Sequence, residues 1–534
     1  MTQHWRKFFP LSSPRLEQER VLDEIVERID SGDRTIILEA GTGVGKSAIA
    51  VCVANYVASL GDRGEEYQPG AYVLTSQKIL QDQYIRDFRQ AADIRSSANF
   101  KCTDGPGETC GQTTRYVMYR SRNEEPRGPA TCPGCPYRTA KDRFIGAPLG
   151  VTNYSYFLSE TVYAGQLEPR ELLVLDEAHN IESEMRRWST VEIDEETSTR
   201  VGASFPFSGK RVETIDWMVS EYRPALQRYI LKLSSKLDDM ERKGIKKGLT
   251  LLIDELDRLD RHVCSLNRIL TEGEVSYDML IDWEEQQNGV RKLKVQPLDA
   301  GQIAKDILYP HGQRVLLMSA TVLSEGIFRK AAGVSGGAFV SCPTPFAPSS
   351  FGIVYRPVGR MARAHLQRTL PKMTQAVRQI LRSHPTEKGI IHCSNYEVTR
   401  AISAINDRRL LIQTNARDRE EMLRRHRTSR EPTVLVSPSM MEGLDLEGDF
   451  GRFQVICKVP FPNMGDPVVE AKRRTGDDWY AWITARTLIQ AVGRCVRSME
   501  DSTRTYVLDE SFGQFFEQWA ELFPHYFSEM EVDV

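Results

Sequence analysis

Short apolar runs alternate with longer amphipathic stretches along most of the chain. In the first part, four such runs lie at residues 35–38, 71–74, 172–175 and 315–318, each bounded by polar or glycine-rich sequence. Short and continuously apolar runs are typical of strands buried on both faces of a parallel sheet. Helical spacing follows the first two runs, at residues 48–60 and 79–88. This alternation predicts a doubly wound α/β domain.

A second set of apolar runs predicts a second α/β domain. The runs lie at residues 389–392, 410–413, 434–436, 455–457 and 506–508. They alternate with helical patterns, of which residues 366–381 form one. After residue 509, interleaved aromatic side chains predict an amphipathic helix packed on this second domain.

Two stretches interrupt the first domain. Residues 101–146 hold four cysteines among many glycines and prolines, and residues 186–296 show the helical spacing of a mainly helical insert. The expected division is residues 1–100, 147–185 and 297–321 for the first domain, 101–146 and 186–296 for the two inserts, and 322–534 for the second domain.

Composition narrows the class of protein. The 534 residues suffice for three or four domains at ~150 residues each. The 70 basic and 73 acidic side chains give a net charge of −3, which excludes a globally basic nucleic-acid binder but not a local basic channel. Apolar runs too short for a bilayer and the lack of a secretory signal pattern lead us to expect a cytoplasmic, nucleoid-associated protein without a membrane partner.

A glycine-rich loop joins the first predicted strand to the first predicted helix. It fits the Walker A pattern, with alanine in place of the first glycine. Backbone N–H groups of such a loop face phosphate oxygens, the lysine adds a positive charge, and the hydroxyl binds Mg²⁺. The candidate ATP-binding residues are Ala40, Gly41, Thr42, Gly43, Val44, Gly45, Lys46 and Ser47.

Polar residues with catalytic chemistry follow two other elements. Asp176 and Glu177 end a predicted buried strand, where one carboxylate can hold Mg²⁺ and the other can orient or deprotonate water. Gln490, Arg494 and Arg497 lie at i, i+4 and i+7, so on a helix they would share one face. Two guanidinium groups that face a γ-phosphate would act as arginine fingers. With Lys46, these five residues are the candidate catalytic set.

Four cysteines of the first insert predict a metal site. Cys102, Cys110, Cys132 and Cys135 lie within 34 residues, and Pro133-Gly134 favours a tight turn in which the last two thiolates converge. Four thiolates suit either Zn²⁺ or a [4Fe–4S] cluster, and the spacing does not decide between them.

These motifs together resemble the XPD/DinG group of superfamily 2 iron–sulfur DNA helicases, and within it the compact archaeal-type XPD proteins. Residues 176–179 match the DEAH box, residues 319–321 the motif that couples ATP to nucleic acid, and residues 490–497 the last helicase motif. The two inserts also stand in the order found in that group. Further similar segments are residues 151–154, 441–445 and 458–462.

The resemblance implies an ATP-dependent 5′→3′ DNA helicase with two RecA-like motor domains, an iron–sulfur domain and an Arch domain. It favours [4Fe–4S] over zinc, and it implies single-stranded DNA and tailed or forked duplexes as partners of a monomer. Gln18, in a short match to a Q-motif, would read the adenine, and Asp445 would contact the nucleotide.

A local basic excess supports DNA binding by the first insert. Residues 101–146 carry eight Lys/Arg and five Asp/Glu, and tyrosines such as Tyr137 and Tyr154 are expected to stack on bases. Our hypothesis is a rigid wedge that splits the duplex. Two other functions stay open: a DNA-stimulated ATPase that acts as a clamp or translocase without strand separation, and a P-loop phosphotransferase for small molecules.

Overall fold

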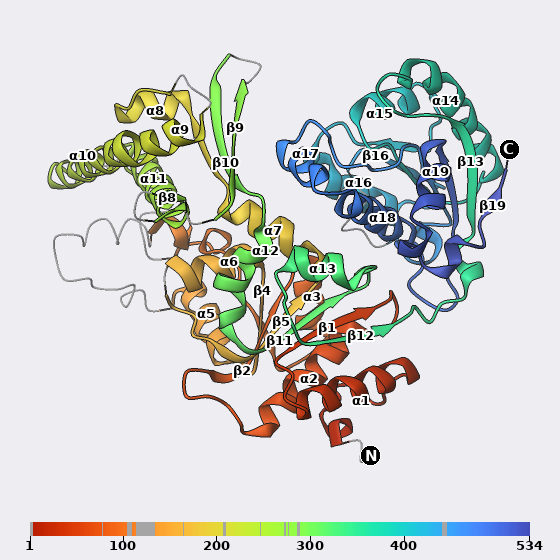
Figure 1. Ribbon diagram of the computed structural model, residues 1–534, viewed down its shortest axis with the longest axis horizontal. Helices are drawn as coiled ribbons and strands as arrows, with labels where there is room; N and C mark the ends of the chain where they lie inside the picture. The colour runs from red at the N-terminus through yellow and green to blue at the C-terminus, as the bar shows by residue number, and fades with distance from the viewer. Residues whose placement is uncertain are drawn as a thin grey trace.

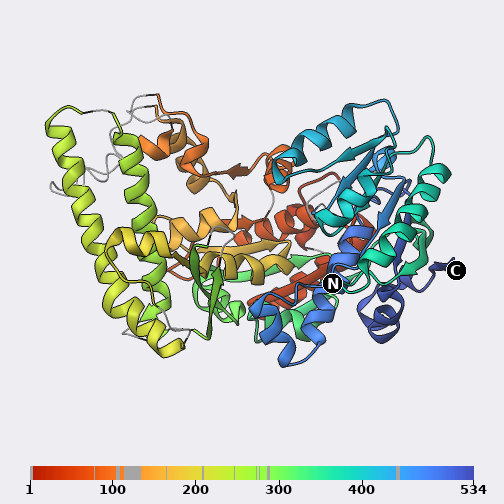
Figure 2. The same cartoon turned by 90° about the horizontal axis from the view of Figure 1, so that it is seen from above.

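The computed structural model describes residues 4–76, 78–103, 109–113, 134–163, 165–206, 210–245, 247–271, 274–275, 277–285, 289–439 and 446–533. Two parallel seven-stranded sheets form the centres of two separate domains, and a third region projects beside the first (Figure 1). Figures 1 and 2 both place the longest helices of that third region at the end of the molecule opposite the second sheet. None of the described helices has the length and apolar content needed to cross a membrane.

The first sheet confirms the predicted α/β domain. Its order is β12-β1-β11-β5-β2-β4-β3, and every pairing between neighbours is parallel. The strands are β1 Thr35–Ala40, β2 Gln68–Leu74, β3 Ala91–Asp93, β4 Leu149–Thr152, β5 Arg170–Asp176, β11 Gly312–Ser319 and β12 Ala338–Cys342. The helices are α1 Leu16–Asp30, α2 Lys46–Leu60, α3 Lys78–Asp87, α5 Pro136–Gly146, α6 Tyr154–Leu158, α7 Ile181–Ser189, α12 Ala300–Ile303 and α13 Glu325–Ala332.

Apolar side chains cover both faces of this sheet. One core joins alternate strand residues to α1 and α2, and the other joins the opposite set to α6, α7, α12 and α13. Burial on both faces explains why these strands are continuously apolar. Strand β12 follows residue 322, the expected start of the second domain, yet it pairs with β1. Its five residues, Ala338–Cys342, are too short and too mixed to stand out as a strand in the sequence.

The second sheet confirms the second α/β domain. Its order is β15-β16-β14-β17-β18-β13-β19, again with parallel pairings. The strands are β13 Ile353–Gly359, β14 Gly389–His392, β15 Leu410–Ile412, β16 Val434–Ser437, β17 Phe453–Ile456, β18 Arg504–Asp509 and β19 Glu531–Val532. The helices are α14 Leu366–Ser383, α15 Tyr396–Ser403, α16 Arg419–Thr428, α17 Pro467–Arg474, α18 Asp478–Val492 and α19 Ser511–Gln518. Phe512, Phe515 and Phe527 bury the C-terminal segment against this domain, as the aromatic pattern predicts.

The third region is less helical than its sequence pattern predicts. Its helices are α8 Glu195–Val201, α9 Arg211–Trp217, α10 Arg223–Arg242 and α11 Leu249–Ile269. They pack on an antiparallel sheet of β6 Val191–Asp194, β10 Arg291–Pro297 and β9 Met279–Glu285, and a short ladder joins β7 Leu270–Thr271 to β8 Glu274–Val275. In β10, buried Leu293 and Val295 alternate with Lys292 and Lys294. This period of two spans too few residues to compete with the long helical patterns beside it.

Candidate nucleotide-binding site

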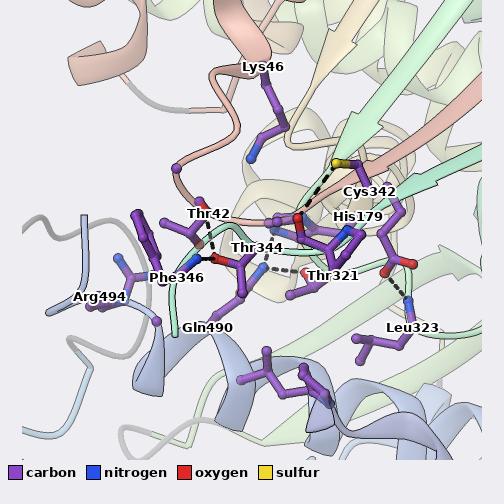
Figure 3. Close-up of a pocket in the computed structure, with 18 of the residues that line it drawn as sticks. Thr42, Lys46, His179, Thr321, Leu323, Cys342, Thr344, Phe346, Gln490 and Arg494 are labelled. Carbon is purple, nitrogen blue, oxygen red and sulfur yellow. Dashed lines mark hydrogen bonds between the residues drawn. The ribbon is translucent and has the colours of Figure 1, made fainter. Parts of the chain in front are cut away.

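A cavity of about 920 Å³ lies between the two sheets and brings most of the candidate residues together. Such a volume is within the range of about 300–1,000 Å³ that small-molecule sites occupy. Its walls come from the phosphate loop, the ends of β5 and β11, the chain after β12, the end of α18 and the segment 521–526. Figure 3 shows Lys46 on one side of this space and Gln490 and Arg494 on the other.

The phosphate loop has the conformation that the Walker A pattern predicts. Gly43 and Gly45 both have φ of 88°, which only glycine adopts freely, and α2 begins at Lys46. The Nζ of Lys46 donates a hydrogen bond to the carbonyl of Ala40 at 3.2 Å, so the ammonium group turns back onto the loop. Because backbone N–H groups and a positive charge meet at a helix N-terminus, this corner can bind phosphate.

The chain after β12 packs directly on the phosphate loop. Thr344 Oγ1 donates to the carbonyl of Thr42 at 2.9 Å, and a Cβ added at Gly43 would lie 2.2 Å from the ring of Phe346. Phe346 also belongs to the aromatic core of the second domain. The loop therefore contacts the connection between the two domains, and no motif in the sequence indicated these two residues.

Asp176 and Glu177 lie at the end of β5, and the first of them is held in a buried, hydrogen-bonded position. Asp176 is buried, its Oδ2 accepts a hydrogen bond from Tyr84 Oη at 3.1 Å, and its Oδ1 accepts one from the backbone N–H of Glu177 at 3.0 Å. Burial and the neighbouring Glu177 raise the pKa of Asp176 to about 6, against the lowering effect of Lys46. A divalent cation would stabilise the charged form, so this pair suits Mg²⁺.

His179 links these carboxylates to both domains. Its Nδ1 lies 2.9 Å from Ser319 Oγ and 3.2 Å from Glu177 Oε2. The amide Nε2 of Gln490 donates to His179 Nε2 at 2.8 Å and to Thr321 Oγ1 at 3.0 Å (Figure 3). A single glutamine of the second domain thus joins the DEAH segment to the residues after β11.

The prediction that Gln490, Arg494 and Arg497 share one helix face is wrong. Helix α18 ends at Val492, so both arginines lie in the turn that follows it. The carboxylate of Asp501 accepts hydrogen bonds at 2.9 Å from the backbone N–H groups of Arg497 and Ser498, which replaces the helical pattern there. All three predicted side chains nevertheless line the same cavity.

Gln18 is not part of the cavity wall as the structure describes it. The Oε1 of Gln18 accepts from the backbone N–H of Arg15 at 2.9 Å, and its Nε2 donates to the carbonyl of Gly45 at 3.3 Å. Arg15 itself lines the cavity and hydrogen-bonds the carbonyl of Gly43. Asp445 lies outside the described residues, and adenine recognition by Gln18 stays a prediction.

Two of the four cysteines of the predicted metal site are in contact. The Sγ atoms of Cys110 and Cys135 are 3.7 Å apart, and Thr113 Oγ1 donates to Cys102 Sγ at 3.1 Å. Cys132 lies outside the described residues, and no three His, Cys, Asp or Glu side chains in the described part of the chain form a metal-binding group. Burial and Cys135 raise the pKa of Cys110 to about 11. A cation that stabilises thiolates would offset that cost, which fits a metal or cluster at this place.

Of the tyrosines expected to stack on DNA bases, Tyr154 is buried and Tyr137 is half-buried, while Tyr116 and Tyr119 lie outside the described residues. Base stacking by Tyr137 stays a prediction. Tyr154 is only 1% exposed, within the core of the first domain. Tyr137 Oη lies 3.0 Å from Tyr156 Oη and 3.3 Å from Glu160 Oε1, so its hydroxyl is held by the protein. Arg138 and Arg143 are exposed on α5.

Comparisons with known proteins agree with this architecture. The family model described as a helicase C-terminal domain matches residues 371–530, and the model described as a type III restriction enzyme res subunit matches residues 11–204. A probable ATP-dependent helicase of Methanocaldococcus jannaschii is 29% identical over 220 residues, which cover 35% of this chain and 32% of that protein. The ATP-dependent DNA helicase DinG of Photobacterium profundum is 25% identical over 244 residues, which cover 41% of this chain and 34% of that protein. The matched part spans about a third of the length of these two relatives.

A solved XPD helicase structure has the same fold. It superposes with a TM-score of 0.63 at 14% identity, covering 98% of this chain and 100% of that one. Both halves of the chain thus match helicase-type family models, and the chain is similar to helicases of the XPD/DinG type.

The two RecA-like domains of this XPD/DinG-like chain also meet away from the cavity. Lys472 of α17 forms an ion pair with Glu182 of α7, and Trp479 Nε1 donates to the same carboxylate at 2.8 Å. Trp482 Nε1 donates to the carbonyl of Val322 at 2.7 Å. Polar contacts of α17 and α18 with the first domain therefore help to set how the two sides of the cavity are placed relative to each other.

Proposed function

We propose that this protein is an ATP-dependent DNA helicase that translocates 5′→3′ along single-stranded DNA. The observation that carries the proposal is the cavity between two helicase domains, in which the phosphate loop and Asp176 face Gln490, Arg494 and Arg497. The names of the DinG and XPD relatives support DNA as the substrate and unwinding as the outcome.

In this proposal each side of the cavity has its own part in hydrolysis. Lys46 and the backbone of the phosphate loop bind the β- and γ-phosphates. Ser47 and Asp176 would hold Mg²⁺, which would neutralise phosphate charge. Glu177 orients or deprotonates the attacking water. Arg494 and Arg497 stabilise the charge that develops on the γ-phosphate, so hydrolysis requires that the domains close. Release of phosphate removes that link and lets them separate.

We further propose that Cys102, Cys110, Cys132 and Cys135 hold a [4Fe–4S] cluster, with Zn²⁺ as the alternative. The contact of two thiols and the XPD/DinG likeness support a group bound there. The cluster would supply rigidity to the insert. Iron and sulfide analysis of anaerobically purified protein distinguishes it from zinc.

The decisive experiment compares ATP-driven displacement of two matched duplexes, one with a 5′ and one with a 3′ single-stranded tail. We expect displacement of the 5′-tailed duplex alone. Displacement of only the 3′-tailed duplex would overturn the polarity. DNA-stimulated ATP hydrolysis without displacement of either would favour the clamp or translocase.

A further inference from the structure

Helix α14 lies on the outer side of the second domain, away from the first sheet (Figure 1), and it carries an exposed basic stripe. The stripe consists of Arg368, Lys372, Arg378 and Arg382, all exposed, while residues such as Met373 and Ile380 bury the opposite face. At 3.6 residues per turn the four side chains fall within about 120° of the helix circumference and extend over about 21 Å.

The stripe has no acidic counterpart. Residues 351–386 contain seven Lys and Arg and no Asp or Glu, in a chain whose net charge is −3. Within the part of the chain that the structure describes, none of the four side chains makes an ion pair or a hydrogen bond. The stripe is therefore a line of uncompensated positive charge.

Several exposed basic residues elsewhere in the chain have an acidic partner on their own helix. Examples are Arg258 with Glu255, Arg424 with Glu421 and Arg474 with Glu470. On α14, by contrast, Arg368 and Lys372, and Arg378 and Arg382, form like-charged i, i+4 pairs, which destabilise a helix. Arg368 in the first turn also opposes the helix dipole. The stability of α14 does not account for this arrangement, whereas an anionic partner does.

We propose that the stripe on α14 is a second DNA-contacting surface, separate from the cavity between the domains, that binds the phosphate backbone of a duplex arm. This inference rests on the proposed function, because it assumes a DNA substrate. A length of about 21 Å matches about six base pairs along one strand, at one phosphate per 3.4 Å. Guanidinium groups bind phosphates with paired hydrogen bonds, and three of the four stripe residues are arginines.

The test compares two variants with the same loss of charge. One carries R368Q, K372Q, R378Q and R382Q, and the matched control carries R86Q, K210Q, R242Q and R424Q, at exposed residues that each have an acidic partner. Binding of a labelled 5′-tailed duplex and of single-stranded DNA is measured by fluorescence anisotropy between 50 and 200 mM NaCl, about the range in which phosphate binding is strongly salt-dependent. ATP hydrolysis at saturating single-stranded DNA is measured in parallel.

We expect the stripe variant alone to bind duplex DNA more weakly. The slope of log K against log salt should become less negative by about 0.9 for each phosphate that the variant no longer binds, up to about 3.6 for four phosphates. Its ATP hydrolysis at saturating single-stranded DNA should stay within about twofold of the unsubstituted protein, since no stripe residue lines the cavity. Thermal melting of both variants verifies that they fold.

Three results would overturn the proposal. An unchanged duplex slope in the stripe variant, with normal DNA binding by the unsubstituted protein, would reject the stripe alone. Failure of the unsubstituted protein to bind DNA would reject the proposed function with it. Unchanged duplex binding together with weaker binding to polyglutamate, or to vesicles that contain phosphatidylserine, would assign the stripe to an acidic protein or a membrane instead.

Discussion

The two parallel sheets have the same number of strands, yet the residues at the carboxyl ends of their strands differ. In the first sheet, β1 leads into the phosphate loop and β5 ends in Asp176. In the second sheet, β14 ends in His392 and continues to Cys393, while β17 continues to Cys457, all of them buried. At the carboxyl ends of the strands, the first sheet places an ionisable side chain beside the cavity. The second sheet places mostly neutral, buried side chains at the corresponding ends.

A carboxylate in each sheet shows what this difference means. Asp176 has a raised pKa, and in the proposed mechanism its charge is used on Mg²⁺. Asp509 ends β18 and accepts hydrogen bonds from the backbone N–H groups of Met361, Ser511 and Val459 at 3.0–3.2 Å. In this proposal Asp176 binds a ligand, whereas Asp509 holds loops together. In the proposed mechanism the first domain therefore supplies the phosphate and Mg²⁺ ligands, and the second domain supplies Arg494 and Arg497.

Removal of Arg494 should have the largest effect on ATP hydrolysis, because it deletes a guanidinium group that the second domain is proposed to direct at the γ-phosphate. Arg494→Ala should lower kcat for ATP hydrolysis by about 10³-fold or more, the range for arginine fingers. ATP affinity should change much less, since the phosphate loop is intact. Single-turnover ATP hydrolysis and nucleotide binding separate the two quantities.

The matched control for Arg494→Ala is Arg504→Ala, an exposed arginine of the same domain that pairs with Glu531. This variant should hydrolyse ATP normally. Equal activity of both variants would contradict a role of the second domain in hydrolysis.

Substitution of Asp176 and of Asp509 by asparagine tests directly whether the two carboxylates have different roles. Asp176→Asn should lower kcat by about 10²-fold or more, because it removes a Mg²⁺ ligand worth several kcal/mol in the transition state. Its stability should be unchanged or higher, since a buried carboxyl with a raised pKa is replaced by a neutral amide. ATPase assays and thermal denaturation on both variants give the result.

Asp509→Asn should have the opposite profile. An amide offers one oxygen to three N–H groups, so the free energy of unfolding should fall by about 1–3 kcal/mol. ATP hydrolysis by the folded fraction should stay within about threefold of normal. Loss of activity without loss of stability at Asp509 would remove the distinction between the two sheets.

The sequence predicted the part of the site that local pattern determines. The phosphate loop, Asp176 and Glu177 follow continuously apolar strands, so both their conformation and their place at one sheet edge could be expected. Arg494 and Arg497 were found by spacing, but their conformation was not, because α18 stops at Val492 and the carboxylate of Asp501 then binds the backbone N–H of Arg497.

The residues that sequence analysis missed depend on contacts between distant segments. Thr344 and Phe346 have no motif, and only the fold brings them onto the phosphate loop. Strand β12 lacks a distinct pattern of its own and is recognisable only by its pairing with β1. Gln18 contacts the backbone of Arg15 and Gly45, and its role in adenine recognition stays a prediction.

Gln490 hydrogen-bonds across the two domains, whereas Gln454 hydrogen-bonds within the second domain, so substitutions at these residues separate the two kinds of contact. Gln490→Ala removes the hydrogen bonds to His179 and Thr321, so DNA-stimulated ATP hydrolysis should fall about tenfold, the effect of roughly 1.4 kcal/mol. Gln454→Ala removes hydrogen bonds to the Val492 carbonyl and Thr505 within the second domain. It should lower the thermal midpoint and leave the activity of the folded protein within about twofold of normal. The reverse result would mean that His179 is positioned from within its own domain.

The smallest expected effect concerns His392, at the end of β14. Because this histidine is buried, we expect the free energy of unfolding to fall at low pH. Burial and the nearby Arg494 lower the pKa of His392 to about 4. The unfolded chain, with a pKa of about 6.5, binds the proton more readily, so the contribution to stability is complete above pH 7 and falls as the pH drops below 6.5. At pH 5.5 this loss is about 1.4 kcal/mol.

The variant His392→Gln should remove that part of the pH dependence, as measured by urea unfolding at pH 7.5 and 5.5. The matched control is His525→Gln, because His525 is 81% exposed in the same domain, and it should leave the pH dependence as it is. An identical loss at pH 5.5 in the unsubstituted protein and in His392→Gln would mean that the histidine is not neutral in the folded state. The strand ends of the second sheet would then accept charge as those of the first do, and the two edges would differ only in the residues that follow them.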